Sequence, residues 1–451
     1  MEKEKKEQER AILISVNTGA FNAVQSLEEL ERLADTAGAI VVGKMMQPRS
    51  TADRGSFLGT GKVEELRRLA DATEANLIIA DDELSPSQQR NLEDALELHV
   101  IDRTVLILDI FAARAQSAEG RLQVEMAQLK YLLPRLRQEN GQLSRLGGGI
   151  GTRGPGETKL ESDRRHIRTR MHRLALELES IEQRRSLYRQ RRRKLEIPTV
   201  AIVGYTNAGK STLLNTLTNA GVLAENQLFA TLDPTARALL LPQGRKVMLV
   251  DTVGLVRRLP HDLVRAFHAT LEEATEADLI LQVSDLSAAD CADQAKVVTD
   301  TLEMLRRKNK PNGEVLPAQP VVHALNKADI APPGAEEAFR LAKYSFLTHD
   351  AALRAAAEDR AAGGVRISAK TGEGLKDLLL AIEQALPPDR QELRLTLPLT
   401  EQKLLAQIQS AGKVLHIMYY EDCMRLTAVI PDWLQPQVTQ YITPQGGLRL
   451  V

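Results

Sequence analysis

The octapeptide Gly204–Ser211 contains the residue types that bind phosphate. It follows Thr199–Val203, whose apolar and β-branched residues predict a buried strand, and it precedes Thr212–Leu217, whose pattern predicts a helix. Strand, glycine loop and helix in this order are typical of the G-x-x-x-x-G-K-[ST] phosphate-binding loop. The residues predicted to contact a nucleoside triphosphate there are Gly204, Tyr205, Thr206, Asn207, Ala208, Gly209, Lys210 and Ser211.

Each residue type in this loop has a physical role. The glycines allow backbone N–H groups to close on phosphate oxygens, and the start of the helix adds a partial positive charge. Lys210 reaches the β- and γ-phosphates and stabilises their charge during phosphoryl transfer, and the Ser211 hydroxyl is a ligand for Mg²⁺. The alternative, an ordinary glycine-rich turn, is disfavoured because the motif is complete and lies between a strand and a helix.

Three further short motifs predict that the base is guanine. The first, Asp251–Gly254, supplies an aspartate that holds Mg²⁺ through water and a Gly254 amide that senses the γ-phosphate. The second is Asn326–Asp329, in which Asp329 accepts two hydrogen bonds from guanine, a pattern that adenine does not offer. In the same motif Asn326 braces the loop and the Lys327 stem packs over the base. The third, Ser368–Lys370, donates a backbone N–H to the guanine O6. The assigned residues are Asp251, Thr252, Val253, Gly254, Asn326, Lys327, Ala328, Asp329, Ser368, Ala369 and Lys370.

These motifs need a sheet that brings them together. Apolar runs predict further strands at 246–250, 279–284, 320–325 and 365–367, with helices between them. Each motif follows the carboxyl end of a strand, which is where α/β sheets bind ligands. We therefore expect a GTP-binding domain over residues 196–387.

The residues before it predict a small parallel α/β domain over 1–110. Apolar runs alternate with helical patterns, one of which begins at Ser26 with a capping-box signature. The expected strands cover 11–16, 39–43, 76–80 and 99–102, and two further helices cover 61–72 and 85–98. Gly59–Lys62 partly resembles a phosphate loop but lacks the first glycine, so a turn that starts a helix is the better interpretation. A separate ATP site near Lys62 is left open.

Residues 111–195 predict two long helices that form a hairpin around a glycine-rich tip. Leucines at helical spacing mark 122–136 and 166–195, and the tip lies at 146–158. Arginines far outnumber acids here, and arginine favours phosphate contact and stacking on bases, so structured RNA is the expected partner. A solvated helix face is the alternative for any one arginine. The candidate RNA contacts are Gly148, Gly149, Arg153, Arg164 and Arg165.

Composition sets the remaining bounds. The 451 residues carry a formal net charge of −1, so any attraction to a polyanion must come from local patches. Cys291 and Cys423 form no metal-binding or disulfide pattern, and no apolar run is long enough to cross a membrane. We expect a cytoplasmic monomer without membrane insertion. Residues 388–451 predict a small α+β domain at the end of the chain.

The four nucleotide motifs resemble the G1, G3, G4 and G5 motifs of translation-factor-related GTPases. Gln227–Thr235 resembles their switch I segment, and Thr231 matches the threonine that binds Mg²⁺. The residues that this similarity adds to the nucleotide site are Phe229, Ala230, Thr231, Leu232 and Asp233. Gly147–Arg165 and Phe57–Leu66 are similar to segments of the HflX family.

The HflX resemblance implies a GTPase that binds the large ribosomal subunit. In that family the hairpin reaches toward the peptidyl-transferase centre, and the GTP-bound state helps to split stalled ribosomes, notably under heat stress. Two alternatives stay open at this stage. One is a GTP-dependent assembly or anti-association factor that only binds subunits, and the other is a signalling GTPase without an RNA partner.

Two positions bear on hydrolysis. Leu255 stands where Ras-like enzymes place a glutamine that orients water, so we expect slow intrinsic hydrolysis that the ribosome stimulates. Asn207 occupies the position that holds K⁺ in potassium-stimulated GTPases, and an ordinary loop cap is the equal alternative. Equal turnover in KCl and NaCl at one ionic strength would exclude the K⁺ role.

Overall fold

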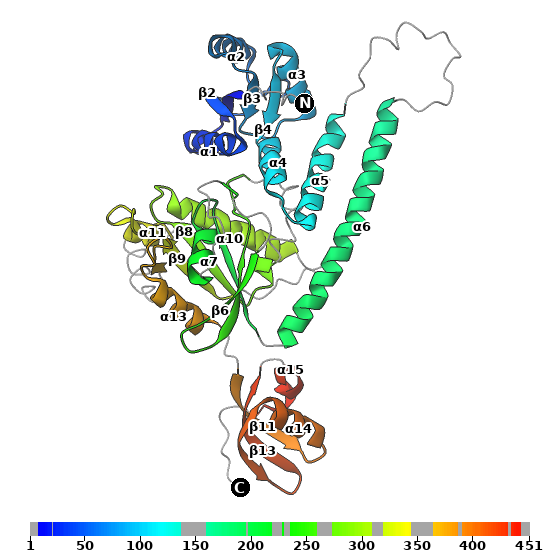
Figure 1. Cartoon of the computed structure of the whole chain (residues 1–451), viewed down its shortest axis with the longest axis vertical. Coiled ribbons are helices and arrows are strands. Elements are labelled where there is room, and N and C mark those ends of the chain that lie inside the picture. The colour runs from blue at the N-terminus through cyan, green and yellow to red at the C-terminus, as the bar shows by residue number, and fades with distance from the viewer. Residues whose placement is uncertain are drawn as a thin grey trace, which may run out of the picture.

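The computed structural model describes residues 8–19, 21–136, 159–194, 197–218, 228–229, 235–258, 273–308, 319–343, 364–386, 390–431 and 434–442. Its strands form three separate sheets of four, six and three strands, which follow one another along the chain (Figure 1). The mixed α/β, multidomain fold predicted from the sequence is confirmed. None of the helices described here is long and apolar enough to cross a membrane.

The N-terminal sheet has the strand order β2-β1-β3-β4, and all its pairs are parallel. Alternate residues of β1 face opposite cores: Leu13 packs with α1 and α4, whereas Ile12 packs with α2 and α3. The elements are β1 (Arg10–Asn17), α1 (Ala23–Ala37), β2 (Ile40–Pro48), α2 (Thr60–Thr73), β3 (Leu77–Ala80), α3 (Pro86–Leu96), β4 (His99–Asp102) and α4 (Arg103–Arg114).

The start of α1 differs from the prediction. The helix begins at Ala23, because the Asn22 side chain accepts the N–H of Gln25 and caps it. Ser26 therefore lies buried inside the helix, and the capping box expected there was wrong. The turn at Gly59 does start helix α2, as predicted, and Lys62 pairs with Glu65 on the same helix.

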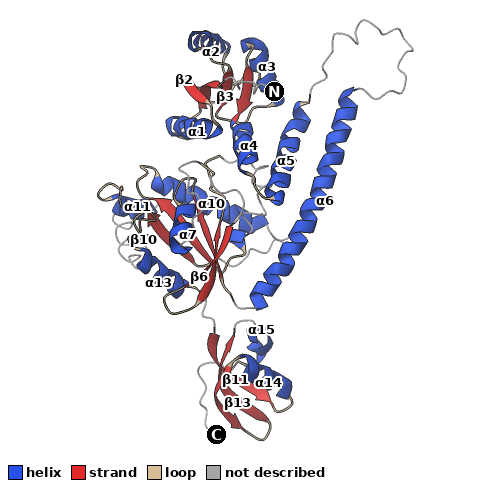
Figure 2. Ribbon diagram, in the orientation of Figure 1, coloured by secondary structure: helices blue, strands red, loops and turns tan. Residues whose placement is uncertain are grey.

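Helices α5 (Ala118–Leu132) and α6 (Lys159–Lys194) lie side by side (Figure 2). Glu125 pairs with Arg170 and Glu119 pairs with Arg185, and this reversed order along the chain shows that the two helices are antiparallel. The 36 residues of α6 make it much longer than α5. The predicted glycine-rich tip, with Gly148, Gly149 and Arg153, lies outside the described residues.

The predicted GTP-binding domain contains a six-stranded sheet with the order β10-β9-β8-β5-β7-β6, parallel except for β6 at the edge. Strand β6 was not predicted, because its sequence is not rich in β-branched residues and it is held by antiparallel pairing with β7. The elements are β5 (Thr199–Gly204), α7 (Lys210–Thr218), β6 (Thr235–Leu240), β7 (Lys246–Asp251), β8 (Leu279–Asp285), α10 (Cys291–Lys308), β9 (Val321–Asn326), α11 (Ala335–Lys343), β10 (Val365–Arg366) and α13 (Leu375–Ala385).

The third sheet is antiparallel, with the order β11-β13-β12. Helix α14 covers it, and Leu395, Ile408 and Met424 are among the residues of their shared core. The elements are β11 (Arg390–Pro398), α14 (Gln402–Ala411), β12 (Lys413–Tyr419), β13 (Cys423–Pro431) and α15 (Gln435–Val438).

Candidate functional site

The phosphate loop joins the end of β5 to the start of α7, as predicted. Lys210 is buried, and its Nζ donates to the carbonyl oxygens of Gly204 at 3.2 Å and Tyr205 at 2.9 Å. These bonds hold the ammonium inside the curve of the loop, where it can neutralise phosphate charge. Gly209 has a φ of +91°, and a Cβ there would lie 2.2 Å from Asn326 Nδ2, so this position excludes other residues.

Two oxygen donors meet at the mouth of the loop. The Ser211 hydroxyl donates to Asp251 Oδ2 at 2.7 Å, which joins the start of α7 to the end of β7. A hydroxyl and a carboxylate are the hard ligands that Mg²⁺ prefers, so these residues fit the ion that a GTPase implies. Ser211 would bind Mg²⁺ directly and Asp251 through water, and the ion would neutralise charge on the phosphates. Thr231, the second predicted ligand, lies outside the described residues, as do Ala230, Leu232 and Asp233.

The residues after Asp251 run back along the phosphate loop. Leu255 donates its N–H to the Gly204 carbonyl at 3.1 Å and accepts the N–H of Thr206 at 2.8 Å. Gly254, the residue before Leu255, lies close to the phosphate loop. A Cβ on Gly254 would come within 2.8 Å of Thr206 and 3.1 Å of Lys210 Nζ. Gly254 is therefore placed beside Lys210, the residue predicted to reach the γ-phosphate. The side chains of Thr252 and Val253 are buried.

Asn326 joins three of the predicted motifs. Its Nδ2 donates to the Ala208 carbonyl at 2.8 Å, and its Oδ1 accepts the N–H of Ala369 at 2.9 Å. The bracing role predicted for Asn326 is thereby confirmed, and it extends to the Ser368–Lys370 loop. The Ala369 amide, from a loop predicted to donate to guanine, is bonded to Asn326 here.

The other residues predicted to form the base pocket lie at the ends of β9 and β10. Asp329 is exposed beyond β9, whereas the Lys327 ammonium pairs with Asp285 at 2.7 Å. The N–H of Ala328 donates to Ile367, and the buried Ser368 hydroxyl accepts the N–H of Thr371. These bonds hold the two loops together and leave the Asp329 side chain exposed to solvent.

Backbone strain marks the same loops. Four residues other than glycine have positive φ in or beside the nucleotide motifs: Asn207 (60°), Phe229 (55°), Arg258 (53°) and Lys327 (62°). Such conformations cost energy and persist only where surrounding contacts impose them, and they are concentrated at functional sites. Residue types and spacing gave no sign of this feature.

Phe229 has a different environment from the one predicted. Its ring is 2% exposed and packs edge-on against Phe111 of α4, with 4.6 Å between the ring centroids. The side chain therefore belongs to a core shared with the N-terminal domain. Its partner lies 118 residues away in the sequence, so no local pattern could reveal the contact.

Burial lowers the pKa of Lys210 to about 8, although the Asp251 carboxylate acts in the opposite direction. Phosphate oxygens would favour the charged ammonium again, so GTP binding at about pH 9 should take up close to one proton per site. Between about pH 8 and 10, affinity should fall by up to roughly tenfold per unit. Stability of the nucleotide-free protein changes in the opposite direction. Its free energy of unfolding rises with pH between about 8 and 10, because over this range only the unfolded chain holds the Lys210 proton.

Calorimetry in two buffers with different ionisation enthalpies measures this uptake. Lys210→Arg is the matched control, because a guanidinium keeps its proton in this range and should show no difference between buffers. A wild-type binding enthalpy that is the same in both buffers would contradict the prediction.

Comparisons with known proteins agree with this geometry. Residues 24–112 match the family described as GTP-binding GTPase N-terminal, residues 114–192 its Middle Region, and residues 199–327 the 50S ribosome-binding GTPase family. GTPase HflX of Caldanaerobacter subterraneus subsp. tengcongensis is 44% identical over 445 residues, which cover 98% of this chain and 96% of the relative. The chain belongs to the HflX family of GTPases.

The comparisons also match a second HflX relative and a solved GTP-binding protein. The HflX GTPase of Escherichia coli (strain K12) is 38% identical over 428 residues, covering 94% of this chain and 95% of the relative. A solved GTP-binding protein from Sulfolobus solfataricus in complex with GDP is 25% identical, with a TM-score of 0.41, over 84% of this chain and 98% of that chain. As an HflX GTPase, the chain hydrolyses GTP, and the loop, motif and strand ends described above are the site predicted for it.

The N-terminal domain forms one wall beside the phosphate loop. A cavity of about 220 Å³ lies between α1 and the loop, and its lining includes Glu28, Glu29 and Arg32 on one side and Thr206 and Asn207 on the other. Nothing in the residue pattern of α1 indicated this position.

Proposed function

We propose that this HflX GTPase binds the large ribosomal subunit and promotes the dissociation of stalled ribosomes, under heat or other stress, with hydrolysis timing its release. The observation that supports this most is helix α6, which extends beyond α5 and carries eleven arginines and two lysines against five acidic residues. That excess on a chain with a net charge of −1 concentrates positive charge on one long helix. The proposed partners are the 50S subunit, the 70S ribosome and their rRNA.

The arginines of α6 do not all have the same role. Arg170 makes two hydrogen bonds to Glu125, at 2.6 and 2.7 Å, and Arg185 pairs with Glu119, so both help to hold α6 on α5. Arg164 is half-buried and Arg165 is exposed, near the end of α6 that leads to the tip. Because they lie near that end, we propose these two as the described part of an RNA-binding surface.

The experiment that tests the proposal follows GTP hydrolysis and subunit splitting together. We expect slow hydrolysis alone, strong stimulation by 50S or 70S particles, and 70S dissociation detected by sedimentation. Arg164→Glu with Arg165→Glu should weaken co-sedimentation and its salt dependence, while Arg170→Glu should instead loosen the hairpin. Neither stimulation nor co-sedimentation in either nucleotide state would overturn the proposal.

A non-hydrolysable GTP analogue separates this function from that of an assembly or anti-association factor. A splitting factor should dissociate one round of ribosomes with the analogue, whereas an anti-association factor should only bind subunits. A signalling GTPase without an RNA partner should show neither effect. The K⁺ role proposed for Asn207 is consistent with its positive φ at the loop and is tested by comparing turnover in KCl and NaCl.

A further inference from the structure

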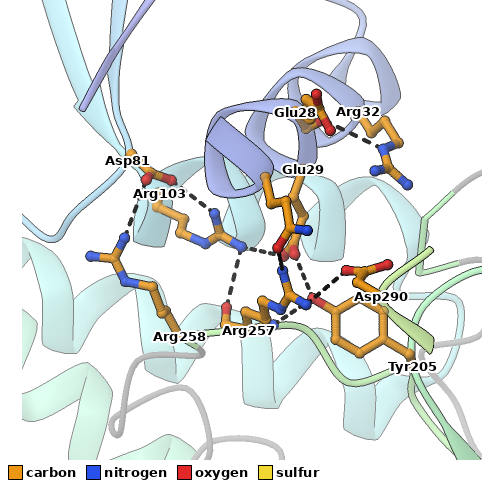
Figure 3. Close-up of polar contacts among 10 residues, drawn as sticks. Glu28, Glu29, Arg32, Asp81, Arg103, Tyr205, Arg257, Arg258 and Asp290 are labelled. Atoms are coloured by element: carbon orange, nitrogen blue, oxygen red, sulfur yellow. Dashed lines mark hydrogen bonds and ion pairs between the residues drawn. The ribbon is translucent and has the colours of Figure 1, made fainter. Parts of the chain in front are cut away.

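The Tyr205 side chain leaves the phosphate loop and enters the N-terminal domain. Its hydroxyl donates to Glu29 of α1 and accepts the N–H of Arg257 at 2.8 Å (Figure 3). Burial and the neighbouring Glu29 carboxylate raise the pKa of Tyr205, so the hydroxyl keeps its proton and acts as the donor. One hydroxyl thus connects the phosphate loop, α1 and the segment that follows Asp251–Gly254, the motif that resembles G3. We call that segment, Leu255–Arg258, the post-G3 segment.

Both main-chain polar groups of Arg257 are bonded, the carbonyl by the N-terminal domain and the N–H by Tyr205 of the phosphate loop. Arg103, at the start of α4, donates to the Arg257 carbonyl at 3.2 Å, while Tyr205 takes the Arg257 N–H. Arg103 is itself fixed by Glu29 and by Asp81, the latter at 3.0 Å. Glu29, Asp81 and Arg103 are all buried, so this contact is held in a low-dielectric environment where hydrogen bonds to charges are strong.

The side chains of the post-G3 segment make further contacts with the same domain. Arg257 bonds to Gln25 of α1 at 3.2 Å and to Asp290 of its own domain at 2.7 Å. Arg258 pairs with Asp81 and Asp82, and its guanidinium lies 4.1 Å from the ring of Phe21. Its φ of 53° is strained, which is expected where outside contacts impose a conformation.

These contacts act on the reacting part of the GTP site. Leu255, two residues before Arg257, is bonded on both sides to the phosphate loop, and Gly254 before it lies against Lys210. With a leucine in place of a water-orienting glutamine, the placement of the γ-phosphate and water depends on main-chain groups of this segment. A shift of about 1 Å in such groups is enough to lower a rate substantially.

We propose that Glu29 is a positioning residue for GTP hydrolysis, acting through Tyr205 and Arg103 to hold the post-G3 segment against the phosphate loop. The N-terminal domain therefore helps to fix the conformation of the GTPase site. This role concerns hydrolysis itself and does not depend on the ribosome.

Single-turnover hydrolysis, with protein in excess over GTP, tests the proposal on the full chain. Glu29→Gln and Tyr205→Phe should each slow the hydrolysis step about tenfold while GTP affinity stays within about twofold. The double variant should be slower by less than the product of the two single effects, because both single variants weaken or remove the shared Glu29–Tyr205 hydrogen bond. Glu31→Gln is the matched control: this carboxylate is on the same helix but pairs with Lys44.

A merely structural role for Glu29 predicts a different result. It would lower the melting temperature and leave the rate per folded molecule unchanged, and that outcome overturns the proposal. Effects of the two variants that multiply, or a parallel loss of GTP affinity, also overturn it. If Glu29→Gln fails to fold, Tyr205→Phe decides alone, because it removes one hydroxyl and keeps the Glu29–Arg103 ion pair.

Discussion

Replacing Asp329 with asparagine should lower the affinity for GTP by about 10³-fold, because two hydrogen bonds from guanine to a charged acceptor are lost at roughly 1.5–3 kcal/mol each. The amide of the variant would instead donate to the carbonyl that xanthine carries in place of the guanine amine. Xanthosine triphosphate should therefore bind the variant better than GTP does. Because Asp329 is exposed beyond β9, the substitution should leave the fold intact.

Competition between the two nucleotides for a fluorescent analogue measures this change in specificity. Asp377→Asn, at an exposed aspartate of α13 in the same domain, is the control and should leave both affinities unchanged. An Asp329→Asn protein that still binds GTP like the wild type would show that Asp329 does not read the base.

Removing the Asn326 side chain should disturb nucleotide binding and stability together. Asn326→Ala leaves the Ala208 carbonyl and the Ala369 N–H without their partner, at about 1–3 kcal/mol for each buried group. We expect the free energy of unfolding of the GTP-binding domain to fall by about 2–6 kcal/mol, and GTP affinity to fall at least about 10²-fold since both loops are predicted to contact the nucleotide.

Asn326→Asp distinguishes bracing from simple packing. It keeps the acceptor for Ala369 and the volume, but it places a carboxylate oxygen against the Ala208 carbonyl, so GTP binding should fall at least as far. Asn91→Ala removes an exposed side-chain hydrogen bond to Gly55 in the N-terminal domain and should leave GTP binding intact. Wild-type affinity in Asn326→Asp would contradict the bracing role.

The elements that could be predicted from the sequence are those specified by local pattern. The order of β5, phosphate loop and α7 follows from motif and hydrophobic run, and Asn326 was assigned its bracing role from its place after β9. The start of α1 was misplaced because Asn22 and Ser26 are both good capping residues, and burial of the helix face decided between them.

Long-range contacts could not be predicted in this way. The residue types of Glu29 and Tyr205 fit a solvated helix and a loop, and 176 positions separate them, yet they meet in a buried hydrogen bond. In the sequence, Arg170 and Arg185 cannot be distinguished from the neighbouring arginines as candidates for RNA binding. In the structure, the packing of α6 on α5 pairs both with glutamates. Such pairings depend on how domains dock, which no periodicity encodes.

The length of α6 has a mechanical consequence. Its 36 residues, at a rise of 1.5 Å each, span about 54 Å from Lys159 to Lys194, and the Lys194 end leads into β5 of the GTP-binding domain. If the helix pivots as a stiff rod about that end, a rotation of about 5° moves the Lys159 end by roughly 5 Å, close to the pitch of one helical turn. In such a rotation the helix would act as a lever, converting a small angular change at the GTP-binding domain into a large displacement at its far end.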